Sequence, residues 1–266
     1  MKVIVCVKQV PDTSGKVAVK PDGTLDRASM ATIINPDDKN AVEAALTLKD
    51  QTGCKVIVVT MGPPPAEGML REILAMGADE AVLVSAREFG GSDTFATSQI
   101  LAAAINKIGV EDDDIVMCGR QAIDGDTAQV GPQIAEKLGI PQITYVADLK
   151  VEGREVTCKR MLEDGYMTIK TETPCLLTAI KELNEPRYMS VGGIFDCYSK
   201  PMQVFDYNAL KDDPLIELDT IGLKGSPTNI FASFTPPQKG QGEMLEGADQ
   251  KTVDVLVDKL LAKHII

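Results

Sequence analysis

The residues with the clearest capacity for chemistry lie between Ile115 and Pro132, where an apolar strand-like run leads into a polar turn rich in glycine. Gly119, Gly125 and Thr127 precede a helix-like segment, and free backbone N–H groups at the start of a helix bind anions such as phosphate. The spacing is neither GxGxxG nor GxxxxGK[ST]. The pattern therefore predicts a nucleotide phosphate site of neither standard type, with an ordinary strand-to-helix connection as the alternative.

The composition indicates that, if the protein takes part in a reaction, a bound cofactor performs it and no side chain does. The single histidine, His264, lies near the carboxyl end, which excludes serine and cysteine hydrolases that depend on histidine. The six cysteines are scattered and form no CxxC pair, so no metal site is expected. We expect that no side chain is catalytic. We also expect that the cysteines are reduced and structural, and that the protein is cytoplasmic.

The charge excludes two classes of partner. A net charge of −12 and a pI near 4.6 repel nucleic acid and anionic membrane surfaces. No apolar run is long enough to span a bilayer. No leader peptide is expected, because Lys8 follows only five apolar residues.

The first half of the chain alternates strand-like and helix-like segments, which predicts an α/β fold with a parallel sheet covered on both faces. The expected strands are 3–7, 56–61, 81–85, 115–118 and 143–146. The expected helices are 41–49, after an Asn35-Pro-Asp-Asp cap, then 69–76, 94–108 and 128–138.

The second half of the chain does not continue the alternation of strands and helices. A hairpin over 149–158 turning at Glu152-Gly153, with strands near 166–171 and 175–180, predicts an antiparallel extension of the sheet. We divide the chain into an α/β domain at 1–200 and an extended arm at 201–266 that ends in an amphipathic helix from Thr252 to His264. The arm lies either on this domain or on a partner subunit, and the second is favoured.

The loop from Gly119 to Gly131, with Met61-Gly-Pro-Pro, resembles the beta subunit of electron transfer flavoproteins, particularly of the electron-bifurcating type. The resemblance covers nearly the whole chain. It implies an adenine-nucleotide α-hydrolase-like, Rossmann-like fold, and a heterodimer with an alpha subunit that carries its own FAD.

The resemblance also implies a set of cofactor contacts. Arg120 would neutralise phosphate charge, and Asp124 and Asp126 would cap the following helix or bind ribose hydroxyls. Cys6 would pack and lie beside adenine through its backbone. The full set is Cys6, Asn35, Asp38, Met61, Gly62, Pro63, Arg120, Gln121, Ala122, Asp124, Gly125, Asp126, Thr127, Gln129, Val130 and Gly131.

Two further segments resemble parts of relatives. Gly90, Gly91, Asp93 and Thr94 resemble a Gly-Gly-x-Asp-Thr turn that would contact NAD, although the default interpretation is a turn capped by Ser92 or Asp93. The similar loop of adenylating enzymes belongs after the first strand, so adenylation is disfavoured. Tyr188 and Val191 lie in a segment that resembles the loop with which relatives bind an acyl-CoA dehydrogenase.

One departure from the family pattern stands in segment 159–178, which resembles the beta-subunit signature. Met167 occupies a position where the family has Glu or Gln. The default interpretation of this segment is a hairpin followed by a buried strand.

The resemblance implies an electron-transfer subunit of a flavin-dependent, NADH-linked oxidoreductase complex. FAD bound here would take a hydride from NADH and divide its electrons between the alpha-subunit FAD, serving an acyl-CoA or hydroxy-acid dehydrogenase, and ferredoxin. A simple AMP-binding carrier is the first alternative. A nucleotide-binding module without redox function is the second.

Overall fold

The computed structural model describes residues 1–12, 31–228, 231, 240 and 242–266. Its strands are β1 Lys2–Cys6, β2 Gln9–Pro11, β3 Thr32–Ile34, β4 Lys55–Met61, β5 Glu80–Val84, β6 Ile115–Gly119, β7 Gln142–Glu152, β8 Glu155–Met161, β9 Tyr166–Glu172, β10 Cys175–Ala179 and β11 Met202–Phe205. Its α-helices are α1 Pro36–Thr52, α2 Glu67–Met76, α3 Thr94–Ile108, α4 Val130–Leu138, α5 Val191–Asp196, α6 Tyr207–Leu210 and α7 Gln250–Ala262. Short 3-10 turns lie at Pro64–Ala66, Arg87–Phe89 and Lys181–Leu183.

Nine of the described strands form one sheet in the order β11-β5-β4-β1-β6-β10-β7-β8-β9. The strands from β11 to β7 run parallel, and β8 and β9 continue the sheet in antiparallel fashion. The α/β class and the predominantly parallel sheet predicted from the sequence are confirmed.

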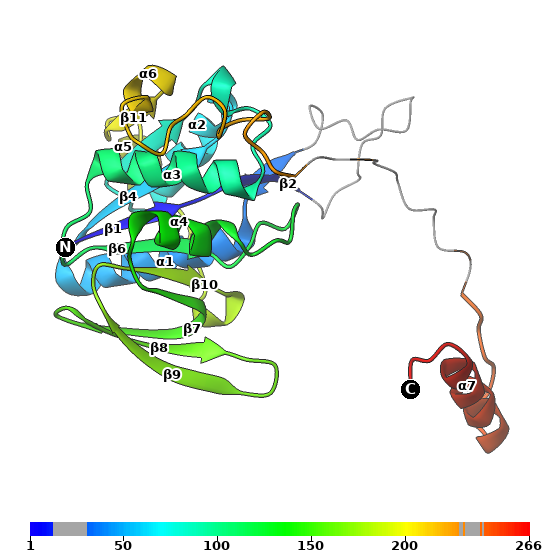
Figure 1. Cartoon of the computed structure of the whole chain (residues 1–266). Coiled ribbons are helices and arrows are strands. Elements are labelled where there is room, and N and C mark those ends of the chain that lie inside the picture. Colours follow the sequence, from blue (N-terminus) through cyan, green and yellow to red (C-terminus); the bar gives the residue numbers. More distant parts are fainter. Residues whose placement is uncertain (13–30, 229–230, 232–239, 241) are drawn as a thin grey trace.

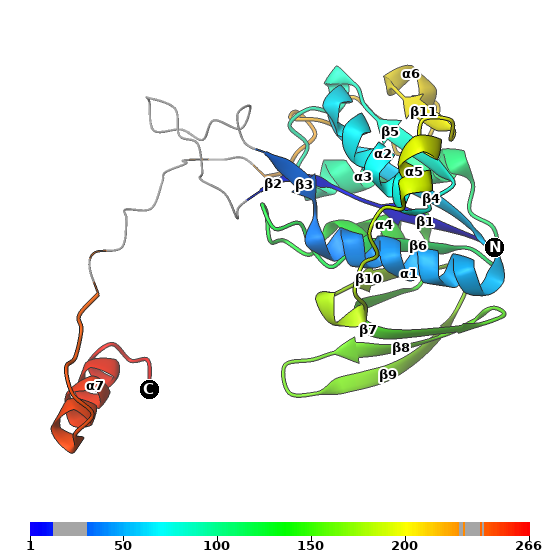
Figure 2. The ribbon, with the colours of Figure 1, turned by 180° about the vertical axis from the view of Figure 1, so that it is seen from behind.

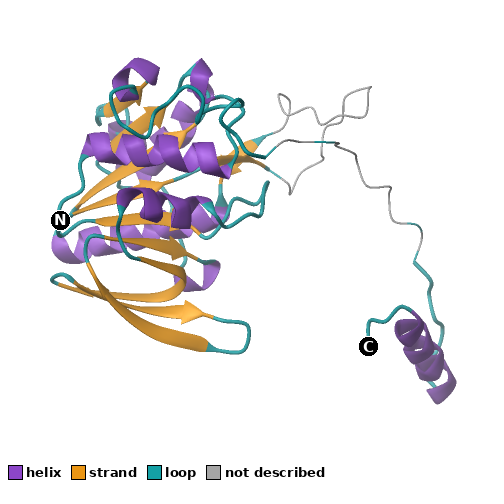
Figure 3. Cartoon of the chain, in the orientation of Figure 1, coloured by secondary structure: helices purple, strands orange, loops and turns teal. Residues whose placement is uncertain are grey.

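Helices cover both faces of the parallel part. Side chains of α1 and α2 pack with Val3, Val5, Val56 and Val58 on one face. Side chains of α3 and α4 pack with Ile4, Ile57, Val59 and Val116 on the other. Figure 1 shows α3 and α4 in front of the sheet, Figure 2 shows α1, α2 and α5 from behind, and Figure 3 shows the strands between the two helical layers.

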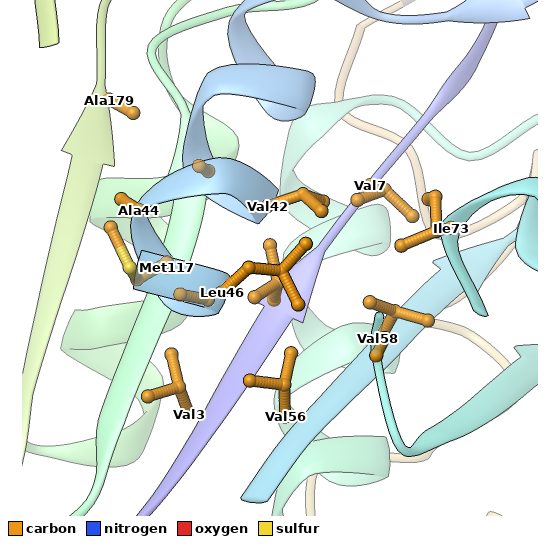
Figure 4. Packing of buried hydrophobic residues seen from close by; sticks show 14 of the residues in the cluster. Val3, Val7, Val42, Ala44, Leu46, Val56, Val58, Ile73, Met117 and Ala179 are labelled. Atoms are coloured by element: carbon orange, nitrogen blue, oxygen red, sulfur yellow. The ribbon is translucent and has the colours of Figure 1, made fainter. Parts of the chain in front are cut away.

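The core beneath α1 is built from small and branched side chains. In Figure 4, Val42, Ala44 and Leu46 of α1 lie over Val3, Val56 and Val58 of the strands and over Val7, which follows β1. Strands buried on both faces are continuous apolar runs, because helices exclude water from each side. This explains why the strands of the first half were visible in the sequence.

The position of β10 corrects the expected extension. The sequence placed residues 175–180 with the antiparallel strands, but β10 runs parallel between β6 and β7. All five residues of β10 are buried, as befits a strand with neighbours on both edges. The hairpin of β7 and β8 and the strand β9 do form the antiparallel extension.

Residues 202–228 belong to the folded domain, whereas the sequence analysis began the arm at residue 201. Strand β11 pairs in parallel with β5 and forms the edge of the sheet. Phe205, Leu210, Ile216 and Ile221 are buried among core residues of α3 and β5. No residue of α7 is buried, and Figure 1 shows this helix apart from the domain.

Candidate functional site

The loop after β6 is held to the amino-terminal end of α1 by Asn35. The side-chain amide of Asn35 donates to the carbonyl of Gln121 at 2.8 Å, and its oxygen accepts from the backbone N–H of Ile123 at 3.0 Å. Asn35 is fully buried and does not cap α1 with its side chain, contrary to the default interpretation of the sequence. Asn35 therefore shapes the loop.

Asp38 joins α1 to the carboxyl ends of two strands. One carboxylate oxygen accepts from the N–H of Lys8 at 2.8 Å and the other from the N–H of Gly119 at 2.9 Å. Burial raises the pKa of the Asp38 carboxyl to about 7, although these hydrogen bonds oppose the shift. A Cβ atom at Gly119 would collide with Asp38, so only glycine permits this approach.

These contacts border a cavity of about 330 Å³ at the carboxyl edge of β1 and β6. Ligands in open parallel sheets bind at this edge, which agrees with the position of the cavity. Of the residues predicted to contact a cofactor or NAD, the cavity brings together Cys6, Asp38, Met61, Asp93, Thr94, Arg120, Gln121, Ala122, Gly125, Thr127, Gln129, Val130 and Gly131.

Residues 127–131 line the cavity at the entry to α4, and their backbone N–H groups have no partner among the described residues. Asp126 and Ala128 adopt left-handed conformations, with φ of 50° and 52°, which residues with a side chain adopt rarely. Such strain is typical of ligand-binding loops, and unpaired N–H groups at a helix start attract anions.

Two cations at the cavity are already paired with carboxylates. The Lys8 ammonium lies 2.7 Å from Asp124, and the Arg120 Nε lies 3.2 Å from Asp37 without the alignment of a hydrogen bond. Burial raises the pKa of Asp37, and the neighbouring Arg120 partly opposes this. The Arg120 guanidinium also lies over the ring of Tyr145. The Tyr145 ring and the Asp37 carboxylate therefore position the Arg120 guanidinium, which keeps N–H donors for a phosphate.

A second cavity, of about 640 Å³, adjoins the first and shares Met61 and Ser92 with it. Gly62, Pro63, Gly90 and Gly91 line this second cavity. The Gly90-Gly91 turn is covered by the segment after α6, because the N–H of Leu223 donates to the Gly90 carbonyl at 3.0 Å. Most of the predicted cofactor and NAD residues thus divide between two neighbouring cavities, whereas Asn35, Asp124 and Asp126 line neither of them.

Comparison with known proteins agrees with this geometry. The model for the "electron transfer flavoprotein domain" matches residues 22–206, which is more than half of the chain. The chain belongs to the electron transfer flavoprotein family. Three relatives align over the full length of both chains: the acryloyl-CoA reductase electron transfer subunit gamma of Anaerotignum propionicum at 72% identity, subunit CarD of the caffeyl-CoA reductase-Etf complex of Acetobacterium woodii at 54%, and an electron transfer flavoprotein subunit beta of Clostridium acetobutylicum at 52%.

The beta-subunit resemblance read from the sequence is therefore confirmed, and the chain has the electron-transfer role of this family. Among the described residues, no helix is long and apolar enough to cross a membrane.

Two aspartates of the family loop do not act as helix caps. Asp124 pairs with Lys8, and Asp126 accepts from the side-chain amide of Gln121 at 2.7 Å. Helix α4 begins two residues later than expected, and no side chain caps it. Of the two roles predicted for Asp124 and Asp126, the helix cap is wrong, because the left-handed conformations at 126 and 128 separate this turn from the helix. Binding of ribose hydroxyls stays a prediction.

Asp93 caps the amino-terminal end of α3, as one of the two alternatives from the sequence predicted. Its carboxylate accepts from the N–H of Ala96 at 3.1 Å and from the N–H of Thr228 at 2.9 Å. The side chain of Thr94 donates to Gln129 at 3.0 Å and so links the starts of α3 and α4. Asp93 and Thr94 thus have structural partners beside the cavity.

Tyr188 and Val191 lie away from both cavities, on the layer of α1 and α2. They are 94% and 75% exposed, whereas Arg187 beside them is bound to Glu43 through two nitrogens. Ile194, Phe195 and Tyr198 add to the exposed apolar surface of this region. Its apolar side chains are presented to solvent on a firmly attached segment.

Several residues of the cavity were missed as site residues by the sequence analysis. They are Val7, Lys8, Ser92, Thr97, Leu101, Cys118 and Ala128. Gly119 was expected at the site and lines the cavity, but its N–H donates to Asp38 and is not free for an anion. Lys8 lies two residues after the end of β1, so its position near a strand end was a usable signal. The thiols of Cys6 and Cys118 interact on neighbouring strands, and this contact together with burial raises the pKa of Cys118. Only tertiary structure brings those two thiols together.

Proposed function

We propose that this chain is the beta subunit of an electron-bifurcating electron transfer flavoprotein and that it binds FAD. The observation that carries the proposal is the pair of adjoining cavities that share Met61 and Ser92. A cavity of about 330 Å³ suits one nucleotide, near the lower limit for small-molecule sites. A dinucleotide needs the additional room that the second cavity offers.

The residues of the first cavity suit the phosphate end of such a cofactor. Five successive N–H groups from residue 127 to 131 supply donors without a negative charge, and Arg120 supplies a positive charge. Phosphate oxygens would compete with Asp37 for Arg120, whose present contact lacks hydrogen-bond alignment. Asp124 and Asp126 lie outside the lining, where carboxylates would not repel phosphate.

The second cavity suits the contact between flavin and nicotinamide. Bound FAD would supply the hydride acceptor for NADH and pass electrons to the alpha-subunit FAD and to ferredoxin. The chain's own contribution is positional, because the Met61-Gly-Pro-Pro turn and the Gly90-Gly91 turn both line the space. NAD contact by Gly90, Gly91, Asp93 and Thr94 remains part of this proposal.

The proposal includes the partners. The alpha subunit would bind the exposed apolar face of α7, and Tyr188 and Val191 would contact an acyl-CoA or hydroxy-acid dehydrogenase. One relative is named as an electron transfer subunit of acryloyl-CoA reductase and another as a subunit of a caffeyl-CoA reductase-Etf complex, which supports a reductase complex of this kind. We place the complex in the cytoplasm, where the six free cysteines remain reduced.

The nucleotide content of the copurified heterodimer tests the proposal. Acid release followed by chromatography should give two FAD per heterodimer and no AMP, and NADH should bleach the flavin absorbance. One FAD with one AMP would instead favour a simple carrier, for which the first cavity alone provides enough room. Absence of both nucleotides from this subunit would contradict the site assignment.

A further inference from the structure

Cys6 and Cys118 form a pair of neighbouring thiols in the wall of the first cavity. Strands β1 and β6 lie side by side (Figure 1), and Val5 pairs with Met117. The next residue of each strand is a cysteine, so Cys6 and Cys118 lie at the same level, and both side chains belong to the face that carries Ile4. Both thiols are free, and they interact with each other. Because the sequence has no CxxC motif, only the fold creates this dithiol.

The cavity gives the dithiol access to small molecules. Both cysteines line it, although each residue is only 6% exposed. The start of α4 lies next to the pair, because a Cβ on Gly131 would lie 3.6 Å from Cβ of Cys118. The unpaired N–H groups of this helix start and the nearby Arg120 favour the thiolate, which is the reactive form, whereas an ionised Asp38 opposes it.

The other cysteines lack this access. Cys158 and Cys175 also interact, but they line neither cavity, and burial raises the pKa of each thiol to about 12. Thiols of that kind are protonated at neutral pH and therefore unreactive. Cys54 and Cys197 are buried and line neither cavity. Among the described residues, only the cysteines of β1 and β6 combine a neighbouring thiol with a position in the wall of either cavity.

The two thiols of the pair are not equivalent. The interaction with Cys6 raises the pKa of the Cys118 thiol, and burial and the charge of Asp38 add to this. Cys118 therefore keeps its proton, which leaves Cys6 as the sulfur that attacks first. One sulfur that attacks and a neighbouring thiol that resolves the product are what disulfide formation requires.

The spacing of the two strands permits a disulfide but strains it. Neighbouring strands lie about 4.7–4.9 Å apart, within the range of about 4.4–6.8 Å between the Cα atoms of disulfides. Side chains at one level of parallel strands point the same way, so their Cβ atoms are about as far apart as the strands, wider than the mean of about 3.8 Å in disulfides. A strained disulfide is reduced easily. A bond between Cys6 and Cys118 should therefore be reversible.

We propose that Cys6 and Cys118 are a site of reversible disulfide formation, open to small neutral disulfides when the cavity is empty and covered by the nucleotide when it is filled. The Cys6 thiolate attacks one sulfur of the small disulfide, whose S–S bond breaks, and the thiolate that leaves takes up the proton that Cys6 lost. Cys118 then gives its proton to the second leaving thiolate as it attacks Sγ of Cys6. Two protein thiols are thus oxidised while one small disulfide is reduced to two thiols. The cover by nucleotide rests on the proposed function, whereas the dithiol does not.

The test uses the full-length chain as it copurifies with its partner subunit, dialysed free of nucleotide and treated with bis-hydroxyethyl disulfide in neutral buffer. Iodoacetamide in denaturant then traps the remaining thiols, and peptide mass mapping locates the disulfide. We expect Cys6 and Cys118 to become linked, and Cys158 and Cys175 to remain free for alkylation. Dithiothreitol should restore the linked pair. FAD or AMP at about ten times its dissociation constant should slow the linkage about tenfold, because only the empty fraction reacts.

Two variants define the order of the steps. Cys118→Ala should stop at a mixed disulfide on Cys6, which adds half of the reagent to the mass of the protein. Cys6→Ala should give neither product, because Cys118 keeps its proton. Cys158→Ala is the matched control, and it should react as the wild type does because Cys158 lines neither cavity.

Two results would overturn the inference. One is that Cys6 and Cys118 both remain free in the nucleotide-free wild-type chain, which requires no variant to fold. The other is a disulfide that forms equally fast when the cavity is filled. If neither FAD nor AMP binds, the proposed function fails, but linkage of Cys6 to Cys118 in the same chain still supports the dithiol site.

Discussion

At the scale of single residues, Asp38 couples the fold around the cavity to pH. Its folded-state pKa of about 7 exceeds the value near 4 of an unfolded chain, so between these values the folded state holds the extra proton. The stabilising contribution is complete below pH 4 and disappears as the pH rises through 7.

We therefore predict that Asp38→Asn removes a pH-dependent loss of stability. In urea titrations, the free energy of unfolding of the wild type should fall between pH 4 and 7 by on the order of 3 kcal/mol through this group, and the variant should lack that slope. Asp249→Asn is the control, because the pKa of Asp249 is lowered and its contribution changes only at more acid pH. A variant that keeps the wild-type slope would contradict the assignment.

Asn35 provides a second prediction at this scale, because it makes two hydrogen bonds to the loop after β6. Asn35→Ala should weaken flavin or nucleotide retention by roughly 10- to 100-fold. The substitution leaves the Gln121 carbonyl and the Ile123 N–H without partners, which costs about 1–3 kcal/mol of free energy. Equilibrium dialysis of the purified heterodimer measures the retained nucleotide. Thr47→Ala, on the same helix and away from the cavity, should retain it fully. Unchanged retention by Asn35→Ala would show that the loop holds its shape without this anchor.

Some residues of the site could be predicted from the sequence and others could not. Arg120, Gln121 and Thr127 could be placed at the site because their loop follows a strand and precedes a helix. The anchoring role of Asn35 could not be predicted, since its partners lie 86 and 88 residues away in the chain. The local sequence around Asn35 is equally typical of a residue that caps the following helix.

At the scale of elements, the glycines of the loop separate into two kinds. A Cβ on Gly131, in the first turn of α4, would lie 2.8 Å from Cγ2 of Thr178 on β10, whereas a Cβ on Gly125 would meet nothing. Gly131→Ala should therefore cost about 1–3 kcal/mol of stability through overpacking. Gly125→Ala should stay within about 0.5 kcal/mol, as expected for a surface substitution. Thermal or urea unfolding of both variants compares them, and equal losses would contradict the packing argument.

Elements differed in how well the sequence predicted them. Helix α3 spans Thr94–Ile108 as expected, because Asp93 caps its start and Gly109 follows its end. Strand β10 was recognised as a strand, but its place between β6 and β7 was not, because an apolar run of five residues does not reveal its neighbours. Long-range pairing decided its direction.

At the scale of the whole molecule, the extent of the domain can be tested by truncation. A chain that ends after residue 228 keeps β11 and the four buried side chains Phe205, Leu210, Ile216 and Ile221, whereas a chain that ends after residue 200 loses them. Each such side chain contributes about 1.5–3 kcal/mol, and the sum rivals the total stability of a domain.

We accordingly predict cooperative unfolding for the chain that ends at residue 228, and loss of the cooperative transition or aggregation for the chain that ends at residue 200. Circular dichroism during thermal unfolding distinguishes them. Full folding of the shorter chain would show that β11 is dispensable. The sequence did not reveal this boundary, because prolines and glycines after Pro201 are typical of an arm although the intervening apolar residues are buried here.

The central place of β10 affects the synthesis of the protein. The ribosome delivers β6 and β7 well before β10, yet β10 lies between them in the finished sheet. One edge of β6 therefore stays without its partner while some sixty residues are added, and its apolar side chains remain available for wrong contacts. A nascent chain is thus most prone to aggregation before residue 180 emerges, and a chaperone that binds apolar strands would protect it most in that interval.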